Sequence, residues 1–238
     1  MKYMATIAMV AILAQPVLAR NYHVSVAGDD ANSGSRMEPL KTIQAAAQLA
    51  QPGDEVVVHA GTYRERVNPP RGGISDSERI VYRAAEGEEA IIKGSEIVKG
   101  WVYQENGYWE LTLPDSFFGD YNPYAELIEG DWFHRKDRDH HLGEVFMNGE
   151  AFYEVATKEE ISGLYGGRTR SWYCESTNGT TTIRGAFGEY NPNRERVEIS
   201  TRSTCFYPDR TGCNYITVRG FTMTQAATQW AAPTAEQV

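Results

Sequence analysis

The sequence predicts an all-β protein: a parallel β-helix that begins with a capping helix and is interrupted by an inserted antiparallel β-sandwich. Short apolar strands follow one another across tight turns in residues 55–94, without helices between them, which is typical of a solenoid. A strand of the same type returns at 214–223. Between residues 95 and 202 the strands instead alternate polar and apolar residues, as antiparallel sheets with one solvated face do.

The first 19 residues have the pattern of a secretory signal peptide. Lys2 supplies a positive charge, residues 4–13 are apolar but too short for a convincing membrane span, and residues 16–19 end in a small-residue cleavage pattern. The other interpretation is a buried N-terminal helix. We expect export to a periplasm or to the cell exterior, a mature chain that begins at Arg20, and no membrane span after cleavage.

Residues 20–94 are expected to form the N-terminal cap and the first coils of the β-helix. Strand 22–26 alternates, and Pro39 fits the first position of a helix that continues at helical spacing over residues 40–51. This helix would cover the apolar end that a solenoid exposes. Further strands are predicted at 55–59, 62–67, 80–83 and 90–94.

Residues 95–202 are expected to form the inserted sandwich. Residues 144–155 predict a hairpin that turns at Asn148-Gly149, which is the strongest short hairpin signal. The other strands are predicted at 108–113, 171–175, 181–184 and 197–199.

Residues 203–238 are expected to return to the β-helix. The stretch 214–223 has the same buried-strand character as residues 55–59, and the last residues, 226–238, show no strong periodicity. A solenoid should continue beyond them and end in a second cap, so we expect the chain to be a fragment. The other interpretation is a complete protein with an irregular tail.

Charge and cysteine content narrow the classes of function. Lys and Arg number 23 and Asp and Glu 32, for a net charge of −9, and the basic residues form no run, which disfavours nucleic-acid binding and anionic polysaccharides. Cys174, Cys205 and Cys213 make no CxxC pair, so a zinc site is not expected. Cys205 and Cys213 could form a disulfide across a short loop or remain free thiols.

Several segments resemble known proteins. Residues 28–30, 39–46 and 52–63 resemble the N-terminal end of many right-handed parallel β-helix proteins, a likeness that indicates fold more than function. Other segments resemble glycoside hydrolase family 120, the β-xylosidases that are built as a β-helix with an inserted β-sandwich. These segments are residues 113–119, 122–124, 130–132, 141–145, 205–208 and 226–235.

The resemblance implies retaining hydrolysis of xylo-oligosaccharides from the non-reducing end, by an Asp nucleophile and a Glu acid/base about 5 Å apart. In the family both lie on later coils, so they are expected beyond Val238 and no catalytic residue is assigned here. No cofactor is expected. A polysaccharide lyase on the same scaffold and a non-catalytic carbohydrate-binding surface protein are the alternatives, and the insertion offers a surface for homo-oligomer formation.

Two tryptophans are candidate sugar-binding residues. The resemblance implies that Trp132 reaches over a sugar pocket, whereas the other interpretation places it in the sandwich core. Trp230 lies among Ala, Thr and Pro residues, which suggests an exposed ring on a rigid loop or, alternatively, a ring packed under the coil.

The polar cluster at residues 137–141 supplies the other candidates, His140 and His141. Three interpretations remain open: contact with sugar hydroxyls, a metal site, or a solvated loop. Adjacent side chains on an extended chain point to opposite sides, whereas metal pairs prefer one face, so no metal is predicted. Glu144 occupies an alternating polar position and is expected on the solvent face.

Overall fold

The computed structural model describes residues 19–105, 107–130, 133, 138–161 and 170–227. These residues are mostly β, as predicted, and contain one α-helix. The N-terminal elements are β1 (Asn21–Val24), α1 (Ile43–Leu49), β2 (Glu55–Val58), β3 (Gly61–Tyr63), β4 (Ile80–Ala84) and β5 (Ala90–Lys93). The middle elements are β6 (Ser95–Ile97), β7 (Val102–Tyr103), β8 (Trp109–Pro114), η1 (Asp115–Phe117), β9 (Val145–Met147), β10 (Glu150–Ala151), β11 (Tyr153–Glu154), η2 (Lys158–Glu160), β12 (Ser171–Thr177), β13 (Thr180–Gly185) and β14 (Val197–Ser200). The chain then forms β15 (Ile216–Arg219) and β16 (Phe221–Thr224).

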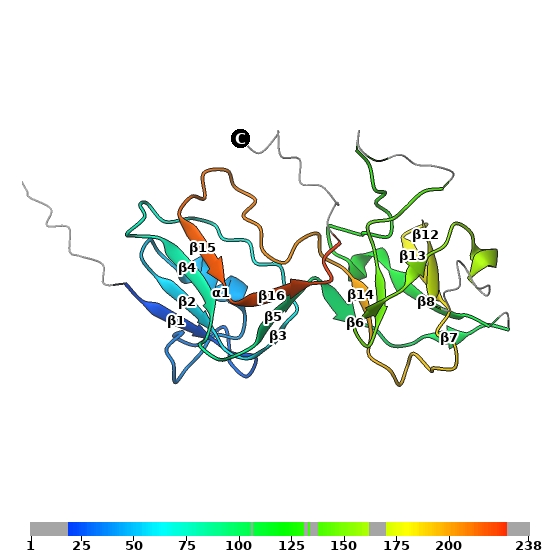
Figure 1. Cartoon of the computed structure of the whole chain (residues 1–238), viewed down its shortest axis with the longest axis horizontal. Helices are drawn as coiled ribbons and strands as arrows, with labels where there is room; N and C mark the ends of the chain where they lie inside the picture. The colour runs from blue at the N-terminus through cyan, green and yellow to red at the C-terminus, as the bar shows by residue number, and fades with distance from the viewer. Residues whose placement is uncertain (1–18, 106, 131–132, 134–137, 162–169, 228–238) are drawn as a thin grey trace, which may run out of the picture.

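The N-terminal elements and the last two strands form two parallel sheets (Figure 1). One sheet has the order β1-β2-β4-β15, and the other has the order β3-β5-β16. The chain steps from the first sheet to the second three times, from β2 to β3, from β4 to β5 and from β15 to β16. Each step stacks on the previous one in parallel register, so we call this part the parallel unit.

The single helix, α1, packs against β1 and β2 at the N-terminal end of the parallel unit. It begins at Ile43, with the Thr42 side chain accepting a hydrogen bond from the Ala45 amide, so the prediction that it starts at Pro39 is wrong. The reason is that Leu40 belongs to the sheet: it bridges Val24, and its amide donates to the His23 carbonyl at 2.9 Å.

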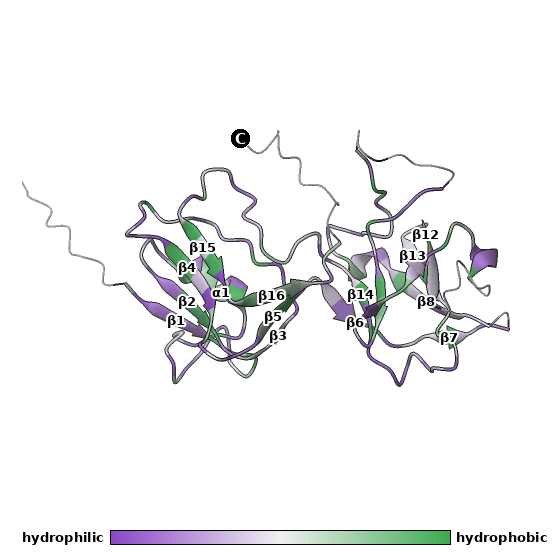
Figure 2. Ribbon diagram, in the orientation of Figure 1, coloured by the Kyte–Doolittle hydropathy of each residue, from purple (hydrophilic) through white to green (hydrophobic). Residues whose placement is uncertain are grey.

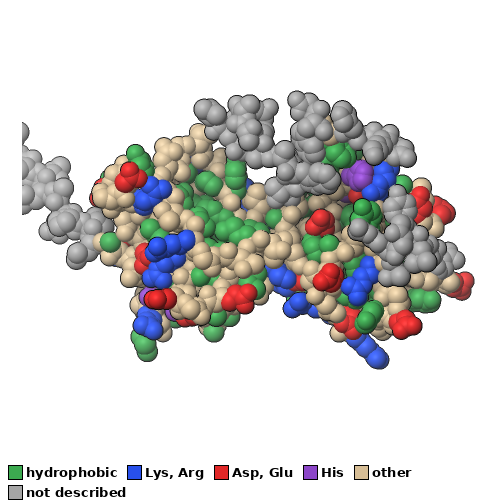
Figure 3. Space-filling model, viewed as in Figure 1, with side chains coloured by type: hydrophobic (Ala, Val, Ile, Leu, Met, Phe, Trp, Pro, Cys, Tyr) green, Lys and Arg blue, Asp and Glu red, His purple; other side chains and the backbone are tan. Residues whose placement is uncertain are grey.

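The return strands pair as the sequence suggests but are less buried than predicted. β15 pairs with β4 and β16 with β5, both parallel. Val218 and Met223 nevertheless remain about 40% exposed, at 37% and 41%, because β15 and β16 are the outermost strands of their sheets. Figure 2 shows hydrophobic residues on β15 and β4, and Figure 3 shows hydrophobic side chains gathered on this face of the molecule.

The middle elements form two largely antiparallel sheets, which we call the inserted unit. Their orders are β10-β9-β14-β6 and β11-β12-β13-β8-β7, and one core of buried residues joins the two sheets, including Met147 of the first and Trp172 of the second. The predicted hairpin is present, with Asn148 and Gly149 at φ 54° and 92°. One pairing departs from the antiparallel pattern, because β11 runs parallel to β12.

The two units meet where the chain leaves and re-enters the parallel sheets. The Gly94 carbonyl accepts the amides of Thr201 and Arg202, at 2.8 and 3.0 Å. A Cβ atom on Gly94 would lie 2.5 Å from the Ala226 Cα, so only glycine lets the return segment pass this closely.

A buried carboxylate reinforces this junction. Glu198 of β14 is fully buried and pairs with Lys93 at 2.7 Å and Arg64 at 2.5 Å, both from the parallel unit. Gln225, whose backbone is in the left-handed region at φ 62°, accepts from Ser95 and donates to Glu198. Charge pairing therefore couples the inserted unit to the chain that precedes it, and the Gln225 amide links the returning chain to the same carboxylate.

All three cysteines are free, so the Cys205–Cys213 disulfide that the spacing allowed is absent. The Cys205 thiol is buried against the Ile92 carbonyl, whereas the Cys213 thiol lies near the Pro69 carbonyl. In the part of the chain that the structure describes, no helix is long and apolar enough to cross a bilayer.

Candidate functional site

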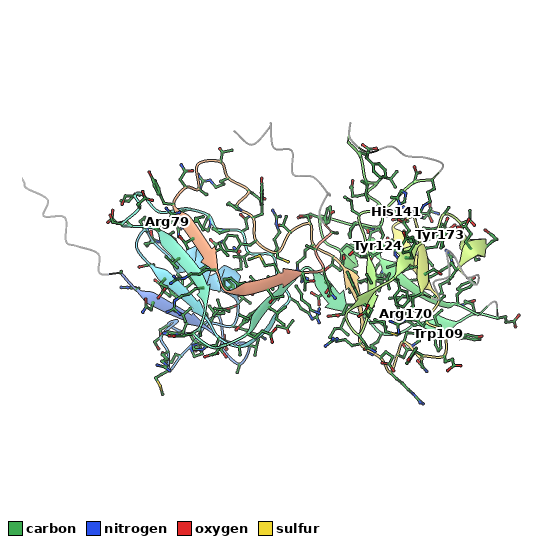
Figure 4. All side chains as sticks on the ribbon, in the orientation of Figure 1. Arg79, Trp109, Tyr124, His141, Arg170 and Tyr173 are labelled. Carbon is green, nitrogen blue, oxygen red and sulfur yellow. The ribbon has the colours of Figure 1, made fainter. Side chains whose placement is uncertain are left out.

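The inserted unit holds a cavity of about 300 Å³ at one end, where Figure 4 labels His141 and Tyr124. Its lining residues are Ile128, Arg138, His140, His141, Leu142, Gly143, Glu144, Phe152, Tyr153, Glu154, Trp172 and Ala226. All but one come from the inserted unit, and Ala226 comes from the segment that follows β16. We call this the His–Glu cavity; its volume is at the lower end of the range for small-molecule sites.

A short antiparallel ladder carries the two histidines. Leu127 bridges His141, the Ile128 amide donates to the His140 carbonyl at 2.7 Å, and the Leu142 amide donates to the Glu126 carbonyl at 3.0 Å. These contacts fix the backbone of residues 126–128 against that of residues 140–142, and so position the two histidines.

Glu154 of β11 is the centre of the polar wall. Its Oε1 lies 2.6 Å from the His141 Nδ1, and the same carboxylate accepts the His141 amide at 3.2 Å. The His140 Nδ1 lies 3.8 Å from the other oxygen, Oε2. Both imidazoles therefore approach one carboxylate, although adjacent side chains on an extended chain would point to opposite sides.

Arg138 and Phe133 hold the outer part of the wall. The Arg138 Nη1 donates to the Glu154 carbonyl at 2.7 Å, and the Phe133 ring meets the His140 ring edge-on at 5.5 Å. Burial, followed by the charge of Arg138, lowers the pKa of His140, so its ring is neutral near pH 7. A neutral imidazole can both donate and accept hydrogen bonds.

The floor of the cavity is aromatic. Trp172 and Phe152 are buried, and Trp172 packs edge-on against Tyr124 with the ring centroids 5.5 Å apart. The Tyr124 hydroxyl donates to the Glu144 carbonyl at 2.7 Å. A Cβ atom on Gly143 would lie 2.5 Å from the Tyr124 ring, so glycine is required for the ladder to pass over this floor.

Glu144 lies at the edge of this floor. Its side chain is exposed, as the alternating pattern predicted, but it also lines the cavity. Loss of surrounding water raises the pKa of Glu144 above the ordinary range of a glutamate. The carboxyl group therefore keeps its proton to a higher pH than usual and can donate a hydrogen bond while protonated.

Two of the four predicted site residues line the cavity, and the other two lie outside the described residues. His140 and His141 lie together in the cavity. Trp132 and Trp230 lie outside the described residues. Sequence reasoning missed Glu154 and the aromatic floor, since each is an ordinary strand or loop residue in sequence; it included Arg138 only as a member of the polar cluster at residues 137–141. Among the described residues, no three His, Cys, Asp or Glu side chains are grouped as a metal site would require.

The fold and the site together define a class of protein. It is rich in β-strands, and its inserted unit holds a cavity with a polar wall and an aromatic floor. Within that class, residues 98–199 match the family model for the insertion domain of glycoside hydrolase 120, and residues 26–69 match a family of unknown function, DUF1565. The matched insertion contains almost the whole lining of the His–Glu cavity.

Two solved structures are similar to this chain. The structure of XylC in complex with xylose matches with a TM-score of 0.84 and 43% identity, covering 90% of this chain and 36% of XylC. A structure described as a glycoside hydrolase matches with a TM-score of 0.53 and 13% identity, covering 91% of this chain and 52% of that one, which shows a shared fold alone. The resemblance to glycoside hydrolase family 120 is therefore confirmed.

Two curated proteins are also similar. Pectate lyase PEL9 of Emericella nidulans is 28% identical over 199 residues, which cover 76% of this chain and 47% of PEL9. The uncharacterised protein YwoF of Bacillus subtilis is 32% identical over 75 residues, which cover 32% of this chain and 16% of YwoF. The chain spans less than half the length of XylC and of both curated relatives.

Proposed function

We propose that this chain is the N-terminal part of an exported retaining glycoside hydrolase that acts on xylo-oligosaccharides. The observation that carries the proposal is the His–Glu cavity, which lies within the glycoside hydrolase 120 insertion match. The 43% identity to XylC, whose structure was determined with xylose, supports a pentose as the sugar.

The same proposal interprets the fold. The stacked steps of the parallel unit are the first coils of a right-handed β-helix, and the inserted unit is a β-sandwich between residues 95 and 202. The parallel registers between β2, β4 and β15 support the first statement. The common core of the two inserted sheets supports the second.

In this proposal the cavity forms one wall of the sugar site. His141, held by Glu154, and the neutral ring of His140 hydrogen-bond sugar hydroxyls, while Glu144 donates or accepts according to pH. The nucleophile and the acid/base come from later coils, beyond Val238. The residues described here therefore bind and orient the sugar and do not perform the bond cleavage.

Hydrolysis of an aryl β-xyloside tests the proposal. We expect release of the aryl group by the chain extended with the residues encoded downstream of Val238 (the extended protein), and none by residues 20–238 alone. Turnover by residues 20–238 would contradict the placement of the catalytic groups. Mass spectrometry of the mature protein should find Arg20 at its N-terminus, which tests export.

A polysaccharide lyase is the second candidate, favoured by the 28% identity to pectate lyase PEL9. A lyase removes a proton beside a uronate carboxylate and leaves an unsaturated sugar that absorbs ultraviolet light. Incubation of the extended protein with polygalacturonate separates the two activities. An ultraviolet-absorbing product, without release of xylose from xylobiose, would replace the hydrolase proposal by this one.

A further inference from the structure

A second cavity, of about 470 Å³, lies at the junction of the two units and shares no lining residue with the His–Glu cavity. It is lined by Glu96, Ile97, Ser116, Phe117, Phe118, Gly119, Thr201 and Arg202. We call it the β6 groove, because β6 forms one of its sides. Its volume is within the range of small-molecule sites.

One side of the β6 groove is apolar and held in place. Phe117 is 40% exposed, and its ring stands edge-on against the buried Phe118 at 5.2 Å. Phe117 ends η1, which is anchored by the Asp115 carboxylate accepting from Thr181 at 3.0 Å. The ring is therefore ordered before any ligand arrives, which lowers the entropic cost of binding.

The other side of the β6 groove is charged but balanced. Glu96 and Arg202 form an ion pair, and the Arg202 Nη1 also donates to the Thr201 hydroxyl at 3.2 Å. The Thr201 amide is fixed on the Gly94 carbonyl at 2.8 Å. Because the two charges cancel, the groove favours a neutral ligand, and the fixed oxygen and nitrogen atoms suit one rich in hydroxyl groups.

We propose that the β6 groove binds a neutral pyranose chain as a surface site, separate from the His–Glu cavity. A pyranose has an apolar C–H face for Phe117 and hydroxyl groups for Glu96 and Arg202. Given the proposed function, the chain would be xylan. A second contact on the same polymer raises its effective concentration at the cavity without new contacts there.

Native electrophoresis of the full chain in gels containing soluble xylan tests this proposal. We expect xylan to retard the wild-type protein, and Phe117→Ala to weaken the retardation about tenfold, as loss of an aromatic anchor does. Phe117→Tyr keeps a ring and should be retarded like the wild type. Tyr103→Ala is the matched control, since Tyr103 is 58% exposed but does not line the groove.

Three results would overturn the surface site. The first is retardation by xylan that does not depend on Phe117 while Phe117→Ala remains folded by thermal unfolding. The second is equal, Phe117-dependent retardation by polygalacturonate, because the groove would then not select a neutral chain. The third is a dimer that Phe117→Ala converts to a monomer in light scattering, because a second copy would then fill the groove.

Hydrolysis assays separate this proposal from the proposed function. The extended Phe117→Ala protein should hydrolyse an aryl xyloside at the wild-type rate, because that substrate does not reach the groove. Absence of xyloside hydrolysis, with retardation that still requires Phe117, would contradict the proposed function and support the surface site.

Discussion

Glu154 is the residue on which the geometry of the His–Glu cavity depends. It accepts the His141 ring and amide, and its second oxygen faces His140. The bond from Glu154 to His141 is short, at 2.6 Å, and a charge-assisted hydrogen bond is stronger than a neutral one. The orientation of both rings is therefore set by a carboxylate that need not touch the sugar.

Glu154→Gln should raise the KM of the extended protein for xylobiose about tenfold and change kcat less, because His141 loses its charged partner and binding weakens. Steady-state kinetics measure both constants. Glu88→Gln is the matched control, since Glu88 pairs with His59 in the parallel unit at 3.1 Å. If both variants raised KM equally, loss of any His–Glu pair would explain the change. The position of Glu154 in the cavity would then not be the cause.

Glu144 predicts a pH dependence. Because loss of surrounding water raises its pKa, the carboxyl group keeps its proton to a higher pH than an ordinary glutamate and ionises as the pH rises further. Glutamine resembles the protonated form, so Glu144→Gln should match the wild-type KM at pH values below this pKa and differ from it at pH values above it. A ratio of KM values that is constant across this range would contradict a role for the proton.

At the scale of the elements, a few backbone segments pass close to their neighbours only because a glycine stands at the contact. Gly143 lets the ladder that carries His141 lie on the Tyr124 ring. Gly143→Ala should destabilise the protein by about 1–3 kcal/mol, since the added methyl group overlaps a buried ring. Urea unfolding measures the change. Gly107→Ala is the control. Gly107 has a positive φ of 86°, but no atom lies within 4 Å of the Cβ that alanine would add, so this variant reports backbone strain alone.

The junction of the two units predicts acid sensitivity. Burial acts to raise the pKa of Glu198, but hydrogen bonds from Lys93 and Arg64 outweigh it and lower the pKa in the folded protein. Because this pKa is lowered, the ionised Glu198 and its two cations stabilise the fold fully at pH values above the unfolded pKa, near 4.3. This stability is lost as the pH falls through the folded pKa.

Glu198→Gln should therefore cost about 3 kcal/mol at pH 7, because it leaves two partly buried cations without their partner. The difference from the wild type should shrink as the pH falls below the unfolded pKa, near 4.3, toward the lowered folded pKa at which the wild-type carboxylate takes up its proton. Urea titrations at pH 7 and below the unfolded pKa measure this. A difference that stays constant with pH would contradict the assignment of the effect to charge pairing.

At the scale of the whole molecule, the described residues of the parallel unit end in two edge strands. β15 and β16 are the outermost strands of their sheets, and hydrophobic side chains gather on this face in Figure 3. Unpaired strand edges with apolar neighbours template pairing with another chain. In the proposed β-helix the next coil would cover this face.

Residues 20–238 should accordingly self-associate with rising concentration, and Val218→Lys should reduce the association by placing a charge on the edge strand. Light scattering at several concentrations measures it. Met37→Lys is the control, because Met37 is 90% exposed but lies in a loop away from β15. If both variants reduce association equally, net charge rather than the strand edge is the cause.

The sequence by itself determined the local elements. Strand alternation, the Asn148-Gly149 turn and the β-branched run at 55–58 predicted strands that the structure contains, because each depends on neighbouring residues only. Local pattern misplaced the helix start, since Leu40 is held by a distant strand. It likewise overestimated the burial of β15, which depends on what stacks beside it.

The site was decided largely by tertiary structure. The motif at residues 137–141 marked His140 and His141, but nothing in the sequence links them to Glu154, which is separated from them by the hairpin of β9 and β10. Nor does it bring Phe117 and Arg202 together in one groove. Residue type and spacing predict which groups can take part in binding, whereas the distances and the desolvation that determine their chemistry arise only when remote strands pack together.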